Sequence, residues 1–181
     1  MLNSKPNNSR FHQGNYVPVN KDKVLKLNAQ GGVYYRSSWE KKIMTWLDNQ
    51  PYITTWGAEC LKIPYQMTHF KDGDMSIKEH CYYPDFYYEL KRSDGTVRKV
   101  VAEVKPSKEF EMVQSISPTD NGVASFNIPQ DASLKKLKNI EYDLKMAQKN
   151  SDKWKTMIKY CEIKGYDFIV ITEDTLKKFN L

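Results

Sequence analysis

The stretch from Cys81 to Pro106 most constrains how this chain can fold. It holds two runs of strand-forming residues on either side of the turn-forming pair Asp94-Gly95. Successive side chains of a strand point to opposite faces, so Glu103 and Lys105 share one face while Val104 points the other way, towards a core. An acidic residue and a lysine two positions apart, with an aspartate on the neighbouring strand, is a pattern typical of metal-dependent nucleases.

The length of the turn decides whether Asp85, on the first run, joins this face. A two-residue loop would place Asp85 opposite Val104, on the wrong face. A three-residue loop over residues 93–95 places Asp85 opposite Glu103, and such loops favour a glycine in the left-handed region at their last position. Gly95 is in that position. We therefore predict the three-residue loop, or a bulge with the same effect.

Two carboxylates on one face require positive charge. At about 4 Å they repel by roughly 4 kcal/mol at an effective dielectric near 20. Lys105 supplies one positive charge, and no paired cysteine or histidine is nearby in sequence, so a magnesium-type ion fits better than zinc. The alternative, an ordinary surface hairpin with a Glu-Lys pair, remains open from the spacing alone.

The length and charge of the chain fit a single domain that meets a polyanion. The 181 residues are enough for a real core, and the net charge is +6. Residues 1–30 hold five basic residues and one acidic residue. Residues 31–130 hold twelve basic and thirteen acidic residues, and residues 131–181 hold eleven basic and eight acidic residues. A near-neutral centre between basic ends suits an acidic site held against a polyanion, although an ordinary soluble protein can share it.

The cysteines and the hydropathy indicate in which cellular compartment the protein is expected. The three cysteines are widely spaced and odd in number, which indicates reduced thiols rather than a disulfide framework or a zinc site. No apolar run is long enough to span a membrane, and no signal peptide is visible. The sequence thus predicts an intracellular protein with no membrane partner.

The first part of the chain predicts an arm followed by a helix. Residues 1–30 are rich in Asn, Lys and Pro, which indicates a basic, flexible arm that either tracks nucleic acid, docks on a partner or is simply disordered. In the helix expected before Pro51, Ser37 and Glu40 have capping-box spacing. Arg36 and Lys41 lie near its start and are candidates for contact with phosphate.

The remaining segments predict an α/β sandwich around a small mixed sheet. Strands are expected over residues 61–66 and 77–90, and a loop-like insertion over 107–132. One helix is expected near residues 134–147, and a second is expected to start at Ser151 and to end before Gly165. The apolar run 168–171 predicts a buried strand, and a short helix follows it.

These parts together resemble the PD-(D/E)xK nuclease superfamily, which has a restriction-endonuclease-like core. The matching parts are Glu40, Pro84-Asp85, Glu103-x-Lys105 and the ITED sequence at 171–174. A more specific combination resembles the head completion nucleases of T-even-type tailed phages, which are related to transposon-encoded endonuclease subunits. Its motifs are YRSSWE (35–40), PYI (51–53), IPY (63–65), PDF (84–86) and EVKP (103–106).

The resemblance implies a site and a reaction. Asp85 and Glu103 would bind Mg²⁺, or Mn²⁺ in its place, with the Val104 carbonyl as a further ligand. Lys105 would orient the attacking water, and Glu40 would assist, so that DNA phosphodiester bonds are hydrolysed. Lys108 joins Arg36 and Lys41 as a candidate contact to DNA, and residues 31–181 would form the nuclease domain.

The resemblance also implies a biological setting. It places the protein in the virion, at the phage head or neck, after assembly in the host cytoplasm. Its partners would be DNA and head, portal or neck proteins, and its role would be to trim packaged DNA late in head completion. The alternatives are a non-catalytic head or neck protein that binds DNA, and a repair or restriction-type endonuclease of the same fold.

Overall fold

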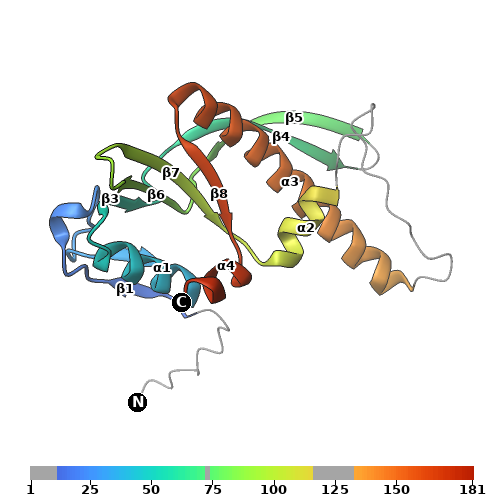
Figure 1. The fold of residues 1–181 in the computed structure, drawn as a ribbon. Helices are drawn as coiled ribbons and strands as arrows, with labels where there is room; N and C mark the ends of the chain where they lie inside the picture. Colours follow the sequence, from blue (N-terminus) through green and yellow to red (C-terminus); the bar gives the residue numbers. More distant parts are fainter. Residues whose placement is uncertain (1–11, 72–73, 116–132) are drawn as a thin grey trace, which may run out of the picture.

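The computed structural model describes residues 12–71, 74–115 and 133–181. Figure 1 shows its elements. The strands are β1 (Gly14–Tyr16), β2 (Val33–Tyr35), β3 (Ile53–Ala58), β4 (Ile63–Lys71), β5 (Asp74–Tyr82), β6 (Phe86–Lys91), β7 (Val97–Val104) and β8 (Asp167–Ile171). The helices are η1 (Lys21–Lys23, a 3-10 turn), α1 (Ser38–Asn49), α2 (Ser107–Ser115), α3 (Leu134–Lys164) and α4 (Glu173–Lys178).

A four-stranded mixed sheet forms the centre, in the order β3-β6-β7-β8 (Figure 1). The first two pairings are antiparallel, and β8 lies parallel to β7. Parallel neighbours need a crossover, and the segment containing α2 and α3 provides it. The predicted α/β fold with a small mixed sheet flanked by helices is confirmed.

The two faces of this sheet are covered by different helices. On one face α1 packs against alternate residues of β6 and β7, including Tyr88 and Ala102. On the other face Met157 and Cys161 of α3 pack against the intervening residues, including Tyr87 and Val101. Because side chains alternate along β7, Glu103 points to the same side as Val101, the side that α3 covers.

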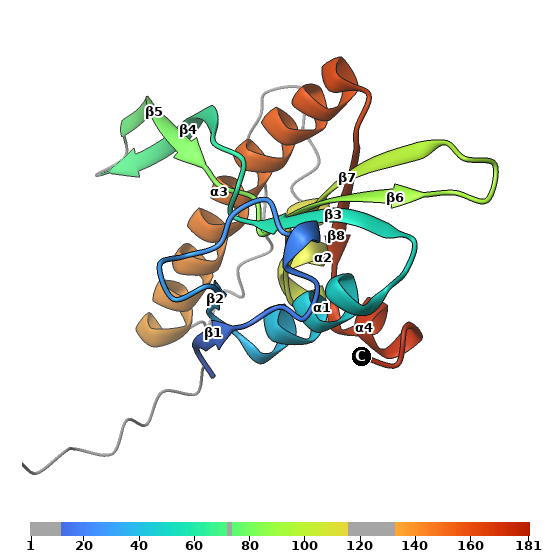
Figure 2. The ribbon, with the colours of Figure 1, turned by 90° about the vertical axis from the view of Figure 1, so that its left-hand side faces the viewer.

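The hairpin of β4 and β5 is a separate two-stranded sheet. It projects past the central sheet on the same side as the first half of α3, and the two diverge with distance from the sheet (Figure 2). Its base packs on α3 through Tyr65 and Tyr82. Since β5 ends at Tyr82, the chain passes from the hairpin directly into Pro84-Asp85, just before β6.

Part of the expected flexible arm is packed on the domain. Residues 1–11 lie outside the described part of the chain, but residues 12–30 include β1 and η1. The buried carboxylate of Asp48 holds this segment, because it accepts hydrogen bonds from the Tyr16 hydroxyl (2.9 Å) and from the backbone N–H groups of Val19 (2.7 Å) and Asn20 (3.0 Å). Composition alone could not reveal this buried acceptor.

Three other expectations about the chain were wrong. The strand expected over residues 77–90 is two strands, β5 and β6, which are separated at residues 83–85. Residues 107–115 of the expected loop form α2, while residues 116–132 lie outside the described part. The two expected late helices are one helix, α3, which Ser133 caps and which ends at Gly165 in the left-handed conformation. No glycine or proline interrupts it, and Ser151 is a buried residue in its interior rather than a cap.

Among the described helices, none is both long enough and apolar enough to cross a lipid bilayer.

Candidate active site

The turn between β6 and β7 has the predicted three-residue form. The Arg92 N–H donates to the Thr96 carbonyl (2.8 Å), and the Gly95 N–H donates to the Arg92 carbonyl (3.0 Å). Gly95 has a φ of +84°, which few other residues adopt. The register that follows pairs Phe86 with Ala102, so the next position towards the site sets Asp85 beside Glu103. The turn prediction is confirmed.

Asp85 follows the buried Pro84 in the chain and comes just before β6. Its Oδ2 accepts a hydrogen bond from the Val104 N–H at 2.7 Å, which fixes the carboxylate across the end of the strand pair. Burial, and then the negative charge of Glu103, raise its pKa to about 7, although the Val104 N–H and Lys105 act in the opposite direction. Burial of Asp85 beside a second carboxylate therefore outweighs the nearby charge of Lys105.

Glu103 is 2% exposed and has two partners. Its Oε1 lies 3.2 Å from the Lys105 ammonium, and its Oε2 accepts a hydrogen bond from the Tyr82 hydroxyl at 2.5 Å. Burial works against the charge on Lys105, but the carboxylates of Glu103 and Asp85 outweigh it and raise the pKa of the lysine. Asp85, Glu103 and Lys105 are thus brought together, as predicted.

Tyr82 and Lys153 belong to this neighbourhood but were not predicted as site residues. The Lys153 ammonium, from α3, lies 4.8 Å from the centre of the Tyr82 ring. Burial lowers its pKa, and its charge interacts with those of Glu103 and Lys105. No spacing in the sequence links Lys153 to Glu103, because α3 crosses the sheet only in the folded chain.

Glu40 performs the predicted capping role at the start of α1. Its carboxylate accepts hydrogen bonds from the Ser37 hydroxyl and the Arg36 N–H, both at 2.8 Å, while its own N–H donates to the Ser37 hydroxyl at 3.1 Å. Glu40 also adds to the negative charge that raises the pKa of Asp85. A structural role and proximity to the site therefore coexist.

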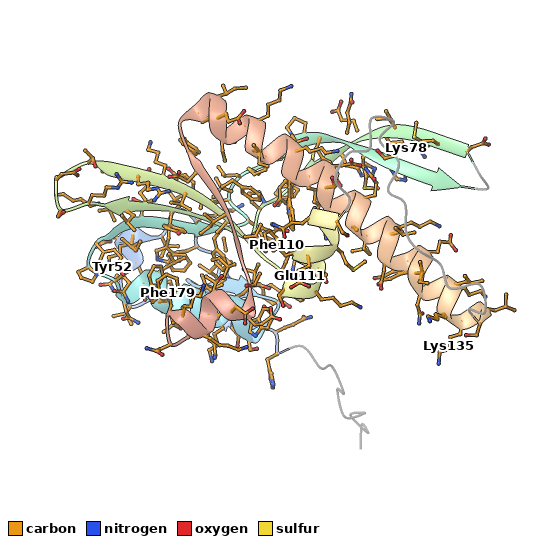
Figure 3. All side chains as sticks on the ribbon, turned by 45° about the vertical axis from the view of Figure 1, so that its right-hand side comes forward. Tyr52, Lys78, Phe110, Glu111, Lys135 and Phe179 are labelled. Atoms are coloured by element: carbon orange, nitrogen blue, oxygen red, sulfur yellow. The ribbon has the colours of Figure 1, made fainter. Side chains whose placement is uncertain are left out.

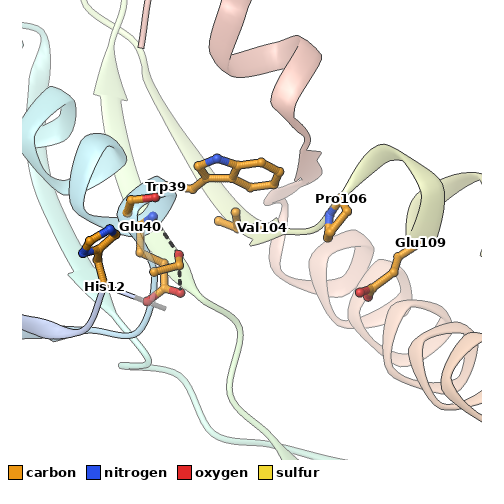
Figure 4. Close-up of a pocket in the computed structure, with 8 residues that line it drawn as sticks. His12, Trp39, Glu40, Val104, Pro106 and Glu109 are labelled. Atoms are coloured by element: carbon orange, nitrogen blue, oxygen red, sulfur yellow. Dashed lines mark hydrogen bonds between the residues drawn. The ribbon is translucent and has the colours of Figure 1, made fainter. Parts of the chain in front are cut away.

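A cleft of about 370 Å³ opens between α1 and α2 beside these groups (Figure 4). Glu40 and Glu109 lie at opposite sides of it, and Val104 and Pro106 lie between them. Glu109 was not predicted; it accepts a long hydrogen bond of 3.5 Å from Asn150 of α3. The cleft is wide enough for solvent and a small anionic group at the exposed edge of the site.

Within the described part of the chain, two of the three residues predicted to contact DNA are paired with carboxylates and one is not. Arg36 forms a two-pronged ion pair with Glu59, at 2.8 and 3.2 Å. The Lys108 ammonium lies 3.6 Å from Asp143. The Lys41 ammonium lies 5.8 Å from the Tyr35 ring centre, which leaves its charge available to solvent.

The donor atoms suit a hard divalent cation. Asp85 and Glu103 offer carboxylate oxygens only, and burial and then the charge of Glu103 raise the pKa of Asp85. Within the described part of the chain, no three Asp, Glu, His or Cys side chains converge on one metal position. Two carboxylates fit an ion that keeps several water molecules, as magnesium does.

Two comparisons with known proteins found a match. Residues 50–173, which include Asp85, Glu103 and Lys105 but not Glu40, match the family described as TnsA-like endonuclease N terminal. The chain is also similar to the head completion nuclease of Enterobacteria phage T4, with 31% identity over 166 residues that cover 92% of this chain and 94% of that protein. No solved structure matches. Because residues 50–173, which are most of this chain, match the model of the TnsA-like endonuclease family, the chain belongs to that family.

Proposed function

We propose that this protein is a divalent-metal-dependent deoxyribonuclease that completes phage heads by trimming packaged DNA. The family match supports the endonuclease activity. The name of the T4 relative, head completion nuclease, supports a setting in head completion. Contact with head, portal or neck proteins of the virion is a further part of the proposal. The trimming step and the need for Mg²⁺ are the parts of the proposal that experiments must test.

One observation carries the chemistry. The three-residue turn sets Asp85 beside Glu103 at one end of the sheet, and Lys105 lies 3.2 Å from the Glu103 carboxylate. Two carboxylates and one lysine at the end of a strand pair form a compact acidic site next to a solvent-filled cleft. A purely structural hairpin has no need to bury Glu103 at 2% exposure.

Asp85 and Glu103 would hold the metal ion, with the Val104 carbonyl as a further ligand. When bound, a divalent ion lowers the pKa of water and offsets charge that develops on the phosphate. The Tyr82 hydroxyl fixes one oxygen of Glu103, and the Val104 N–H fixes one oxygen of Asp85. Both carboxylates are thereby preorganised before any ligand arrives.

Lys105 has the position to act on the reacting groups. Its ammonium orients the attacking water and stabilises negative charge on the pentacovalent phosphorus. The water oxygen forms a bond to phosphorus while the bond from phosphorus to the leaving sugar oxygen breaks. The water gives a proton to solvent, and the leaving sugar oxygen takes one up. Glu40 adds negative charge at the edge of the site, and this charge favours retention of the cation.

The decisive test is plasmid cleavage in Mg²⁺, with EDTA as the control for metal. We expect Glu103→Gln and Lys105→Ala to lower cleavage at least about 100-fold, since each removes a group that acts on the reacting centre. The matched controls are Glu79→Gln and Lys62→Ala, which change the same residue types at exposed positions. Circular dichroism shows whether all variants are folded.

The outcomes separate the competing ideas. Loss of cleavage in both site variants, with normal controls, supports the nuclease and its site together. Equal cleavage by all variants means that a contaminant or another site cuts the DNA. Absence of cleavage by the folded wild type contradicts the proposal for the isolated protein and favours a DNA-binding structural component of the head.

Metal binding can be measured without turnover. A ligand at 100 times its Kd stabilises the folded state by about 2.7 kcal/mol. For a chain of this size, that corresponds to a rise in Tm of roughly 5–10 °C. We expect Mg²⁺ or Mn²⁺ to raise the Tm of the wild type and not that of Glu103→Gln; an equal rise in both would place the ion elsewhere.

A further inference from the structure

One face of α3 carries a row of lysines that leads to the site. Lys135, Lys138, Lys145, Lys149 and Lys153 follow one another with Tyr142 at spacings of three or four residues. Residues at these spacings lie on the same side of a helix. The row belongs to a helix with nine lysines and four acidic residues, so its positive charge is not balanced along its length.

The inner end of the row touches the site. Lys153 lies over the ring of Tyr82, whose hydroxyl binds Glu103, and its charge interacts with Glu103 and Asp85. The exposure of the row falls towards this end: Lys135, Lys138 and Lys145 are exposed, whereas Lys149 and Lys153 are partly buried. The row therefore runs from open solvent to the buried carboxylates.

The acidic residues of α3 do not interrupt the row. Glu141 and Asp152 lie on its flank, where Glu141 pairs with Lys145 and Asp152 accepts hydrogen bonds from the Thr68 N–H and the Gln148 amide. Over residues 12–71, 74–115 and 133–181, Lys135, Lys138 and Lys149 have no carboxylate within 4.0 Å. Their charges are free to meet a ligand.

The row has the length of a DNA contact. From Lys135 to Lys153 it rises by roughly 27 Å at 1.5 Å per residue. That length matches the rise of about eight nucleotides of a duplex strand. Figure 3 shows Lys135 at the outer end of α3, which projects well past the sheet.

We infer that this lysine row is the surface that binds the DNA phosphate backbone and guides it to the site. The inference rests on the proposed nuclease function and adds a binding surface to it. Positive charge spaced along a rigid helix complements the regular negative charge of a nucleic acid strand. Such contacts position DNA without reading its bases, so the surface fits a substrate of any sequence.

The test is equilibrium binding of a duplex of about 20 base pairs by fluorescence anisotropy, in EDTA and over a range of salt concentrations. The row variant carries Lys135→Gln, Lys138→Gln and Lys149→Gln. The matched control carries Lys136→Gln, Lys155→Gln and Lys159→Gln, three exposed positions on other sides of the same helix. Both variants lose the same net charge, and glutamine retains a high helix propensity.

We expect the row variant to bind about tenfold more weakly at low salt. Its plot of log K against log salt should be less steep by roughly 2–3, close to one unit for each lost phosphate contact. The control should keep the wild-type slope and affinity within about twofold. An unchanged slope in the row variant, or equal losses in both variants, overturns the inference.

This result is independent of the cleavage assay, because EDTA prevents metal-dependent turnover. Weaker binding by the row variant with no cleavage by the wild type would support the surface and contradict the proposed activity. Normal binding by the row variant with Glu103-dependent cleavage would contradict the surface and leave the activity supported. Circular dichroism at 222 nm checks that α3 is intact in both variants.

Discussion

The Tyr82 hydroxyl donates a 2.5 Å hydrogen bond to Oε2 of Glu103, a carboxylate that is 2% exposed. Burial and then the charge of Glu103 raise the pKa of this tyrosine well above its usual range, so the phenol stays protonated and remains a donor. Tyr82 therefore acts on the site through Glu103, as a positioning residue on β5.

Removal of this donor should slow cleavage without removing it. A hydrogen bond to a charged group contributes about 1.5–3 kcal/mol, so Tyr82→Phe should lower the rate by roughly 10-fold to 100-fold. The half-saturating Mg²⁺ concentration should also rise, because Glu103 is held less firmly. Tyr83→Phe is the matched control, since its neighbouring ring is 45% exposed. An unchanged Mg²⁺ dependence in Tyr82→Phe would reduce Tyr82 to a packing role.

Asp85 should make the metal-free protein less stable at higher pH. Its folded-state pKa is raised from 3.8 to about 7, first by burial and then by Glu103. The contribution is fully present below the unfolded pKa near 3.8 and is lost as the pH rises through 7. In EDTA, Asp85→Asn should therefore raise the Tm at pH 8 by a few degrees, and raise it by less at pH 5, which lies between the two pKa values.

Asp94→Asn is a control, because the fold lowers the pKa of Asp94 whereas it raises the pKa of Asp85. Its carboxylate accepts hydrogen bonds from the Thr96 hydroxyl and N–H, which lower its pKa. Its contribution is present above the unfolded pKa, so the substitution should leave the Tm at pH 8 unchanged or slightly lower. A fall in Tm at pH 8 for Asp85→Asn would show that the charge of Asp85 is well compensated without metal.

Two substitutions separate the roles of Glu40. Glutamine also serves at this position of a capping box, so Glu40→Gln keeps the cap but removes the charge. Glu40→Ala removes both and should cost about 1 kcal/mol of stability. If Glu40 assists the site, Glu40→Gln lowers cleavage several-fold at wild-type stability, as measured by plasmid cleavage and thermal unfolding. If Glu40→Gln cleaves DNA at the wild-type rate, Glu40 has only its role in capping α1.

Asp48 should hold the N-terminal segment on the domain. Asp48→Ala leaves the Tyr16 hydroxyl and two backbone N–H groups without their acceptor, so we expect a loss of about 2–4 kcal/mol and a fall in Tm of roughly 5–15 °C. The pKa of Tyr16, raised to about 12 by burial and by Asp48, should fall in the variant. Asp74→Ala, at an exposed carboxylate, is the control; a similar loss in both would contradict this role.

The parts of the site that the sequence predicts are the local ones. The glycine at position 95 selects the loop length, the loop length sets the register, and the register brings Asp85 beside Glu103. The capping box at Ser37 and Glu40 is equally local. Each depends on residues a few positions apart or on one hairpin, where turn chemistry and side-chain alternation leave few choices.

The parts that the sequence does not predict depend on how distant elements cross. Lys153 meets Tyr82 only because α3 lies across the face of the sheet that carries Glu103. Asp48 is an ordinary helical acid in sequence, and its role appears only when residues 16–20 pack against it. Serine is a residue type that often caps helices, so Ser151 was expected to start a helix. Instead it lies buried in the interior of α3, because that face of the continuous helix packs against the rest of the domain.

The strand that closes the sheet beside Glu103 is made late in synthesis. The Lys105 N–H donates to the Ile171 carbonyl (3.0 Å), and the Glu173 carboxylate accepts hydrogen bonds from the Ser107 hydroxyl (2.6 Å) and N–H (2.8 Å). A nascent chain that has emerged only to Lys164 holds every acidic group of the site but lacks β8, which pins Lys105 in place. Completion of the site therefore waits until β8 and the start of α4 have been made.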